Sequence, residues 1–100
     1  MKIYSSSGIQ TTALRLFNTY GPGQNMSNMK QGMISIYLAQ LMNSKDIEVH
    51  GSLKRFRDLI YIDDVTRIIL NLTKWKSFKF NVLNIGTGLK TSVEDIILGI

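Results

Sequence analysis

The stretch RDLIYIDDV, residues 57–65, joins a short apolar run to charges at both of its ends. A buried strand rarely opens with a bare Arg-Asp pair and closes with two carboxylates, so these charges need partners or a function. Leu59–Ile62 is expected to be a short strand, and Asp63 or Asp64 is expected to cap a helix that follows. Arg57 then remains to be explained.

Outward from this stretch, strand and helix patterns alternate. Residues 11–18, TTALRLFN, have a strand-like composition and lead into a turn signal at residues 20–23. Residues 32–43 predict an amphipathic helix of about three turns, and Ile47–His50 a short strand. The buried face of that helix is expected to carry Ile34, Tyr37, Leu38, Leu41 and Met42.

The same alternation continues beyond the stretch. The helix after Asp64 is expected to run through Leu72, and residues 80–86, FNVLNIG, are a continuous apolar run of the kind buried on both faces of a parallel sheet. Thr91 and Glu94 have the spacing of a capping box that opens a last helix. Such alternation predicts an α/β fold with right-handed crossovers.

Composition limits the classes of protein. The chain has 100 residues, of which 44% are hydrophobic and 19% charged, and this is typical of one small domain. The net charge of +5 suits a nucleic acid, an anionic membrane or a phosphorylated small molecule. Without cysteine and with one histidine, the sequence has no disulfide framework or metal cluster, and it favours a cytoplasmic setting. No apolar run approaches the roughly 20 residues of a membrane span, so no membrane partner is expected.

Three segments taken in order then identify a resemblance. LRLFNTYGPGQ from Leu14, RDLIYIDDV from Arg57 and NIGTGLKTSVEDI from Asn84 resemble the second half of the extended short-chain dehydrogenase/reductases. Within that group, the likeness is to the NAD-dependent nucleotide-sugar epimerases and dehydratases, with UDP-glucose 4-epimerase-like members nearest. It covers nearly the whole chain from Leu14 onward. The resemblance implies the later strands and helices of a Rossmann-like parallel sheet, plus part of the small substrate-binding region.

In that family, the amino-terminal half binds NAD through a glycine-rich turn, and a Tyr-x-x-x-Lys pair transfers protons. Neither motif is found here: Tyr4 is followed four places on by Gly8, and Gly86-Thr87-Gly88 has Thr91 where a third glycine would fall. We therefore expect residues 1–100 to be one partial domain, truncated at both ends, that lacks the NAD-binding half. The parent enzyme is expected to be a homodimer that uses NAD, and this chain alone is expected to be inactive, without catalytic residues.

The resemblance assigns Arg57 to the diphosphate of a nucleotide-sugar substrate. A planar guanidinium binds phosphate oxygens in a bidentate fork better than an ammonium does. Judged from its chemistry alone, Arg57 could instead pair with Asp58 or with one of the capping carboxylates. The relatives often carry Gly-Asp-Gly before this arginine, whereas this chain has Gly51-Ser52-Leu53. Arg55 could therefore replace or supplement Arg57.

Further contacts follow from the same resemblance. Asn18 corresponds to an asparagine whose amide donates to substrate phosphate or sugar, although it could simply shape the turn before Gly21. Phe17 corresponds to a residue that touches the nicotinamide end of NAD, or it is a core aromatic. The nucleotide pocket would be lined by Met33, Ile34, Glu48, Val49 and His50. Met33 and Ile34 could equally be core residues, and His50 is expected to stack or to lie on the surface rather than to catalyse.

The rival hypothesis is a basic, non-enzymatic module that binds nucleic acid, based on the net charge and on the run SLKRFR. The basic residues are spread along the chain, however, and no helix-turn-helix or RNA-recognition signature accompanies them. A salt titration separates the two hypotheses, because polyanion binding weakens by orders of magnitude as salt rises. The identity of the sugar and nucleotide, and the choice among epimerase, dehydratase and decarboxylase, are left open.

Overall fold

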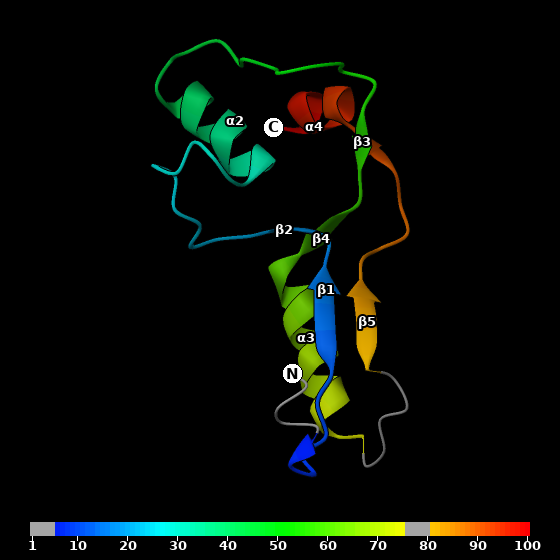
Figure 1. Cartoon of the computed structure of the whole chain (residues 1–100). Coiled ribbons are helices and arrows are strands. Elements are labelled where there is room, and N and C mark those ends of the chain that lie inside the picture. Colours follow the sequence, from blue (N-terminus) through cyan, green and yellow to red (C-terminus); the bar gives the residue numbers. More distant parts are fainter. Residues whose placement is uncertain (1–5, 76–80) are drawn as a thin grey trace.

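The computed structural model describes residues 6–75 and 81–100. Phe80 of the run FNVLNIG lies outside these residues. The described chain is elongated, with extents of 53 × 26 × 22 Å. Figure 1 shows α3 (Ile62–Thr73) beside strands β1 and β4 at one end, and α2 (Met33–Met42) with α4 (Val93–Gly99) at the other.

Two parallel strand pairs confirm the predicted α/β class. β1 (Ala13–Leu16) pairs with β5 (Val82–Ile85), and β2 (Asn18–Tyr20) pairs with β4 (Leu59–Tyr61). The single strand expected over residues 11–18 is therefore two strands, because the chain changes partner at Phe17. The predicted strand at Leu59–Ile62 is confirmed, with its end one residue earlier.

A third, antiparallel pair joins β3 (Phe56–Arg57) to β6 (Thr91–Ser92). In its register, Arg57 lies opposite Thr91. The strand expected at Ile47–His50 is absent, and that segment has no regular secondary structure. Its apolar side chains are used in another way, because Ile47 and Val49 pack against the core cluster around Tyr37.

The helix starts differ in detail from the predicted caps. Asp63 and Asp64 lie in the first turn of α3 instead of at its N-cap, which is Tyr61. There they still complement the positive end of the helix dipole. The capping box of α4 is formed by Ser92 and Asp95, one residue later than predicted, because Thr91 belongs to β6.

Two hydrophobic clusters hold the two ends of the molecule. Ile60, Val65 and Ile85 form the centre of one, between α3 and the parallel strands. Tyr37, Val93 and Ile96 form the other, between α2 and α4. Consecutive residues of β4 serve opposite clusters, since Leu59 packs against the second and Ile60 belongs to the first.

Two predictions about buried faces are wrong. In α2, Leu41 and Met42 are exposed (44% and 77%), while Ser35 and Ala39 are buried beside the correctly predicted Tyr37. This helix is apolar almost all round, so its neighbours and not its periodicity decide which face is buried. The run at β5 is covered on one face only, because Val82 is 44% exposed while Ile85 is buried.

Candidate functional site

The ends of several strands meet at one place in the middle of the molecule. β1 and β5 both end there, and the residue after β1, Phe17, donates its backbone N–H to Ile85 O at 2.9 Å. Asn18 then donates its backbone N–H to Asp58 O at 3.2 Å, just ahead of β4. In open α/β sheets, ligands bind outside the carboxyl ends of the strands. By this rule, a ligand would lie near Asn18 and the residues around Asp58.

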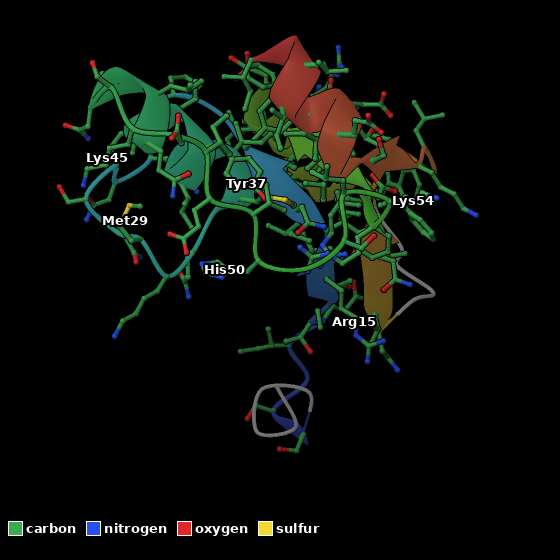
Figure 2. The ribbon with its side chains drawn as sticks, turned by 90° about the horizontal axis from the view of Figure 1, so that it is seen from above. Arg15, Met29, Tyr37, Lys45, His50 and Lys54 are labelled. Atoms are coloured by element: carbon green, nitrogen blue, oxygen red, sulfur yellow. The ribbon has the colours of Figure 1, made fainter. Side chains whose placement is uncertain are left out.

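A pocket of about 470 Å³ opens beside this place. Of the predicted site residues, it is lined by Asn18, Met33, Glu48, His50 and Arg57. Lys30, Tyr37, Gln40 and Arg55 also line it. Figure 2 shows labelled Met29, Tyr37 and His50, which line the pocket from the loop before α2, from α2 and from the segment after it. The fold thus brings together residues that are up to 39 positions apart, from Asn18 to Arg57.

Arg57 is half-buried, and its Nη1 donates to the carbonyl of Phe56 at 3.0 Å. Within residues 6–75 and 81–100, the ion pairs are His50 with Glu48 and Arg67 with Asp64, so Arg57 has no carboxylate partner there. The alternative pairing of Arg57 with Asp58 or with a capping carboxylate is not found. A guanidinium with five N–H donors therefore lies at the pocket with most of them uncommitted.

Arg55 lines the same pocket but is bonded differently. Its Nε donates to Ser52 O at 3.1 Å, and its Nη2 donates to His50 O. The turn between these carbonyls contains Gly51 at φ 99°, a backbone conformation that favours glycine. Arg55 therefore holds the loop that departs from the family's Gly-Asp-Gly pattern, whereas Arg57 has more donors for a ligand.

Asn18 is attached to the chain through one side of its amide. Its Nδ2 donates to Asp58 O at 3.2 Å, which is the same carbonyl that accepts its backbone N–H. This contact orients the side chain at the pocket and leaves its Oδ1 acceptor and a second N–H for other partners. Asn18 is the first residue of β2, three positions before Gly21.

The segment after α2 divides its side chains between core and pocket. The backbone N–H of Glu48 donates to Gln40 Oε1 at 3.1 Å, which attaches the segment to α2. Glu48 and His50 line the pocket, with side chains 73% and 86% exposed and 3.7 Å apart. Val49 does not line it and packs into the core instead, so only its backbone could serve a ligand.

The start of α2 borders a second hollow of about 230 Å³, where Ile34 lies together with Asn18 and Met33. Asn18 and Met33 line both hollows, so the two adjoin. The N-cap of α2 is Gly32, at φ 84°, and no side chain caps the helix. Free N–H groups at a helix start attract anions, and here they add to the positive potential beside Asn18.

Phe17 lies apart from both hollows, and its side chain is 44% exposed, so it is not a core aromatic. Its ring lies against Gly86: a Cβ added to that glycine would be 2.5 Å from Phe17 Cδ2. The ring therefore lies at the carboxyl ends of β1 and β5, on the turn that follows β5.

The turn after β5 is hydrogen-bonded to the carboxylate of Asp58. Asp58 Oδ1 accepts from Thr87 N at 2.9 Å and from Thr87 Oγ1 at 2.7 Å, and Asp58 Oδ2 accepts from Gly88 N at 2.7 Å. The bond from the Thr87 hydroxyl, followed by that from the Thr87 N–H, holds the pKa of Asp58 below its ordinary value of 3.8. Desolvation opposes this lowering, and the bond from the Gly88 N–H adds to it. These amides are therefore already used and do not cradle a ligand phosphate.

Sequence reasoning missed several of these residues. Asp58 was weighed only as a partner of Arg57, because its real partners lie about thirty positions later in the chain. Lys30, Tyr37 and Gln40 also line the pocket. Tyr37 and Gln40 stand three positions apart on α2, a spacing that places them on one helical face and that could have indicated both.

Residues 6–75 and 81–100 contain no group of three or more His, Cys, Asp or Glu side chains able to hold a metal ion. None of the described helices is long and apolar enough to cross a membrane. In Figure 2, the labelled Lys45 lies on the opposite side of the molecule from Arg15 and Lys54.

The chain is similar to known proteins over most of its length. Residues 2–86 match the family model described as the NAD dependent epimerase/dehydratase family. A protein of Methanocaldococcus jannaschii, provisionally named a UDP-glucose 4-epimerase, is 32% identical over 97 residues, which cover 96% of this chain and 30% of that protein. The dTDP-4-dehydro-6-deoxyglucose reductase of Escherichia coli is 32% identical over 88% of this chain and 27% of its own length.

Among solved structures, the UDP-glucose 4-epimerase of Thermotoga maritima with UDP-glucose matches with a TM-score of 0.82 at 31% identity. The match covers 97% of this chain and 30% of that structure. The chain thus spans less than a third of the length of these relatives.

Proposed function

Since the chain belongs to the NAD-dependent epimerase/dehydratase family, we propose that it forms the substrate-binding face of a nucleotide-sugar epimerase or dehydratase. The reaction we favour is that of a UDP-glucose 4-epimerase, which two of the similar proteins are named for. The observation that carries the proposal is the pocket itself, because Asn18 and Arg57 line the same hollow of about 470 Å³.

In this proposal, Arg57 binds the diphosphate of the substrate. Its uncommitted N–H donors match phosphate oxygens, and Lys30 and Arg55 add positive charge around the same pocket. The only carboxylate among the lining residues of this pocket is Glu48, whose side chain is largely exposed. A doubly charged diphosphate would therefore enter a site with a surplus of positive charge.

The remaining residues would orient the substrate. Asn18 would donate to a phosphate or sugar oxygen, with its amide fixed by the carbonyl of Asp58. The uncapped start of α2, at Met33 and Ile34, would add N–H donors near the same ligand. Glu48 and His50, which line the same pocket, would contact the nucleotide base.

NAD, the cofactor of the family, supplies reversible hydride transfer when it is bound. The described residues fit one contact with it: the exposed ring of Phe17 at the carboxyl ends of β1 and β5 could pack against a flat ring. The amides of Thr87 and Gly88 already bind Asp58 and are not free for its phosphates. The role of this chain is therefore to hold the substrate.

The test is Arg57→Met, made in the protein at the full length of its open reading frame. Removing charge-assisted hydrogen bonds worth about 1.5–3 kcal/mol should raise the Michaelis constant for UDP-glucose roughly 10- to 150-fold. NAD affinity should stay unchanged, because Arg57 lies in the substrate pocket and not beside Phe17.

Arg67→Met is the matched control, because Arg67 is an exposed arginine on α3 that pairs with Asp64 outside the pocket. It should leave both affinities as in the wild type. An unchanged Michaelis constant in the Arg57 variant would contradict the proposal. Equal binding of UDP-glucose and unrelated polyanions, lost together as salt rises, would favour the nucleic-acid hypothesis instead.

A further inference from the structure

Asp58 lies between the two residues proposed to bind the substrate and contacts the chain on both sides. We infer that Asp58 is a positioning residue for the substrate site: its backbone carbonyl holds Asn18, and its carboxylate fixes the turn that leads to the strand paired with Arg57. The inference rests on the proposed function of Asn18 and Arg57.

The backbone side of Asp58 fixes Asn18. Its carbonyl oxygen accepts two hydrogen bonds from Asn18, at 3.2 Å from the backbone N–H and at 3.2 Å from Nδ2. These two bonds fix both the strand start and the rotamer of the amide. A shift of Asp58 would therefore move the Asn18 amide relative to the pocket.

The carboxylate side fixes the turn Gly86–Leu89. Three donors converge on the two oxygens, namely Thr87 N, Thr87 Oγ1 and Gly88 N, at 2.7–2.9 Å. Thr87 Oγ1 in turn accepts from Leu89 N at 3.1 Å, so the whole turn is organised around this carboxylate. The approach is close, because a Cβ on Gly86 would lie 2.8 Å from Asp58 Oδ2.

The position of this turn also affects the position of Arg57. It leads directly into β6, where Thr91 is the register partner of Arg57. The start of α4 adds a second attachment, because Val93 N donates to Arg55 O at 2.8 Å. A turn that loosens at Thr87 would thus loosen the strand that holds the guanidinium at the pocket.

The chemistry of this contact requires a carboxylate. All three converging groups are donors, and an ionised carboxylate only accepts. An asparagine would offer one oxygen and one NH₂ group, so at least one donor of the turn would face another donor. The lowered pKa of Asp58 agrees with a carboxylate that stays ionised in this contact.

The experiment measures UDP affinity by isothermal titration calorimetry, on the full-length protein, for Asp58→Asn, Thr87→Val and Asp46→Asn. We expect the dissociation constant for UDP to rise about tenfold in the Asp58 variant and about threefold in the Thr87 variant. Asp46→Asn removes the same charge from an exposed loop residue outside the pocket, and should bind UDP as the wild type does. All titrations are made well below the unfolding midpoint of each variant.

A double variant separates positioning from plain stability. If Thr87 and Asp58 act through one contact, the loss of UDP binding free energy in the double variant Asp58→Asn/Thr87→Val should be smaller than the sum of the losses in the two single variants. An Asp58 variant with a lower melting temperature and unchanged UDP affinity would reduce Asp58 to a structural residue and overturn the inference. If that variant does not fold, unchanged affinity in Thr87→Val overturns it instead.

Arg57→Met in the same titrations distinguishes the two proposals. Weak UDP binding in the Arg57 variant, with wild-type binding in the Asp58 variant, would leave the proposed function standing and remove only the positioning role. Wild-type UDP binding in the Arg57 variant would remove the proposed function, and with it the inference that depends on it.

Discussion

At the scale of single residues, the two arginines of the pocket differ in how many of their donors are bonded within the chain. Arg55 gives two of its N–H groups to the carbonyls of the preceding turn, whereas Arg57 gives one to its neighbour. The sequence alone left open which of them meets a phosphate. More donors of Arg57 stay uncommitted, which supports the proposal that Arg57 binds the phosphate, and this difference depends on how the turn at Gly51 is closed.

The Asp58 contact also predicts a pH dependence of stability. Because its folded pKa lies below the ordinary value of 3.8, the unfolded chain binds the proton first as acid is added. The stability that this carboxylate contributes is therefore fully present above about pH 4, and is lost as the pH falls through the lower, folded pKa. Urea unfolding at a series of pH values should show a steeper acid loss in the wild type than in Asp58→Asn. Parallel curves would contradict this prediction.

The resemblance, which rests on local motifs, named residues that the fold brings together. Asn18, Met33, Glu48, His50 and Arg57 line one pocket, and their role in binding stays a prediction. Asp58 could not be predicted in its actual role, because its partners are supplied by a turn that only the β1–β5 pairing brings near. Contacts between distant segments carry no local signal in a single sequence.

At the scale of elements, the start of α4 has a structural role for the site. Ser92 Oγ accepts from Asp95 N at 3.0 Å, while Asp95 accepts from the Ser92 backbone at 3.4 Å. The same helix start donates from Val93 to Arg55 and from Glu94 to Leu53. The helix therefore holds the loop that leads into β3.

Replacing Ser92 by alanine removes this cap. We expect a loss of about 1 kcal/mol in the free energy of unfolding, measured by chemical denaturation, since N-cap replacements typically cost that much. A weaker effect is expected for Thr91→Ala, because Thr91 is the residue that the sequence pattern wrongly placed in the box. A larger loss for Thr91 than for Ser92 would argue against this cap.

Elements were predictable where one local rule applied without a competitor. The apolar run before Asp63 is a strand because β2 supplies a partner for it. Ile47–His50 has a similar composition but no partner strand, and its Glu48 N–H bonds to the side chain of Gln40 instead. The residues TSVED allow two capping boxes, and only the pairing of Thr91 with β3 selects between them.

At the scale of the whole molecule, the described chain is extended and exposes much surface. Its radius of gyration is 17.1 Å, against roughly 13 Å for a compact chain of this length. Its accessible surface is 7866 Å², against roughly 5,700 Å² for a compact monomer of 11.3 kDa. Two small clusters in place of one core explain this excess.

Residues 1–100 expressed alone should therefore unfold with little cooperativity. Each cluster is centred on three buried side chains, which is a small hydrophobic core against the conformational entropy of a hundred residues. We expect binding of a hydrophobic dye under native conditions and a broad thermal transition by circular dichroism. A single sharp transition without dye binding would show that the two clusters form a self-sufficient unit.

The alternation of β4 between the two clusters has a mechanical consequence. Leu59 packs against one cluster and Ile60 belongs to the other, so β4 connects the two ends of the molecule. Asp58, immediately before Leu59, is bonded to Asn18 and to the turn after β5. A ligand bound between Asn18 and α2, as proposed, would also hold β2 and α2 together, so that substrate binding would stiffen the connection between the two ends.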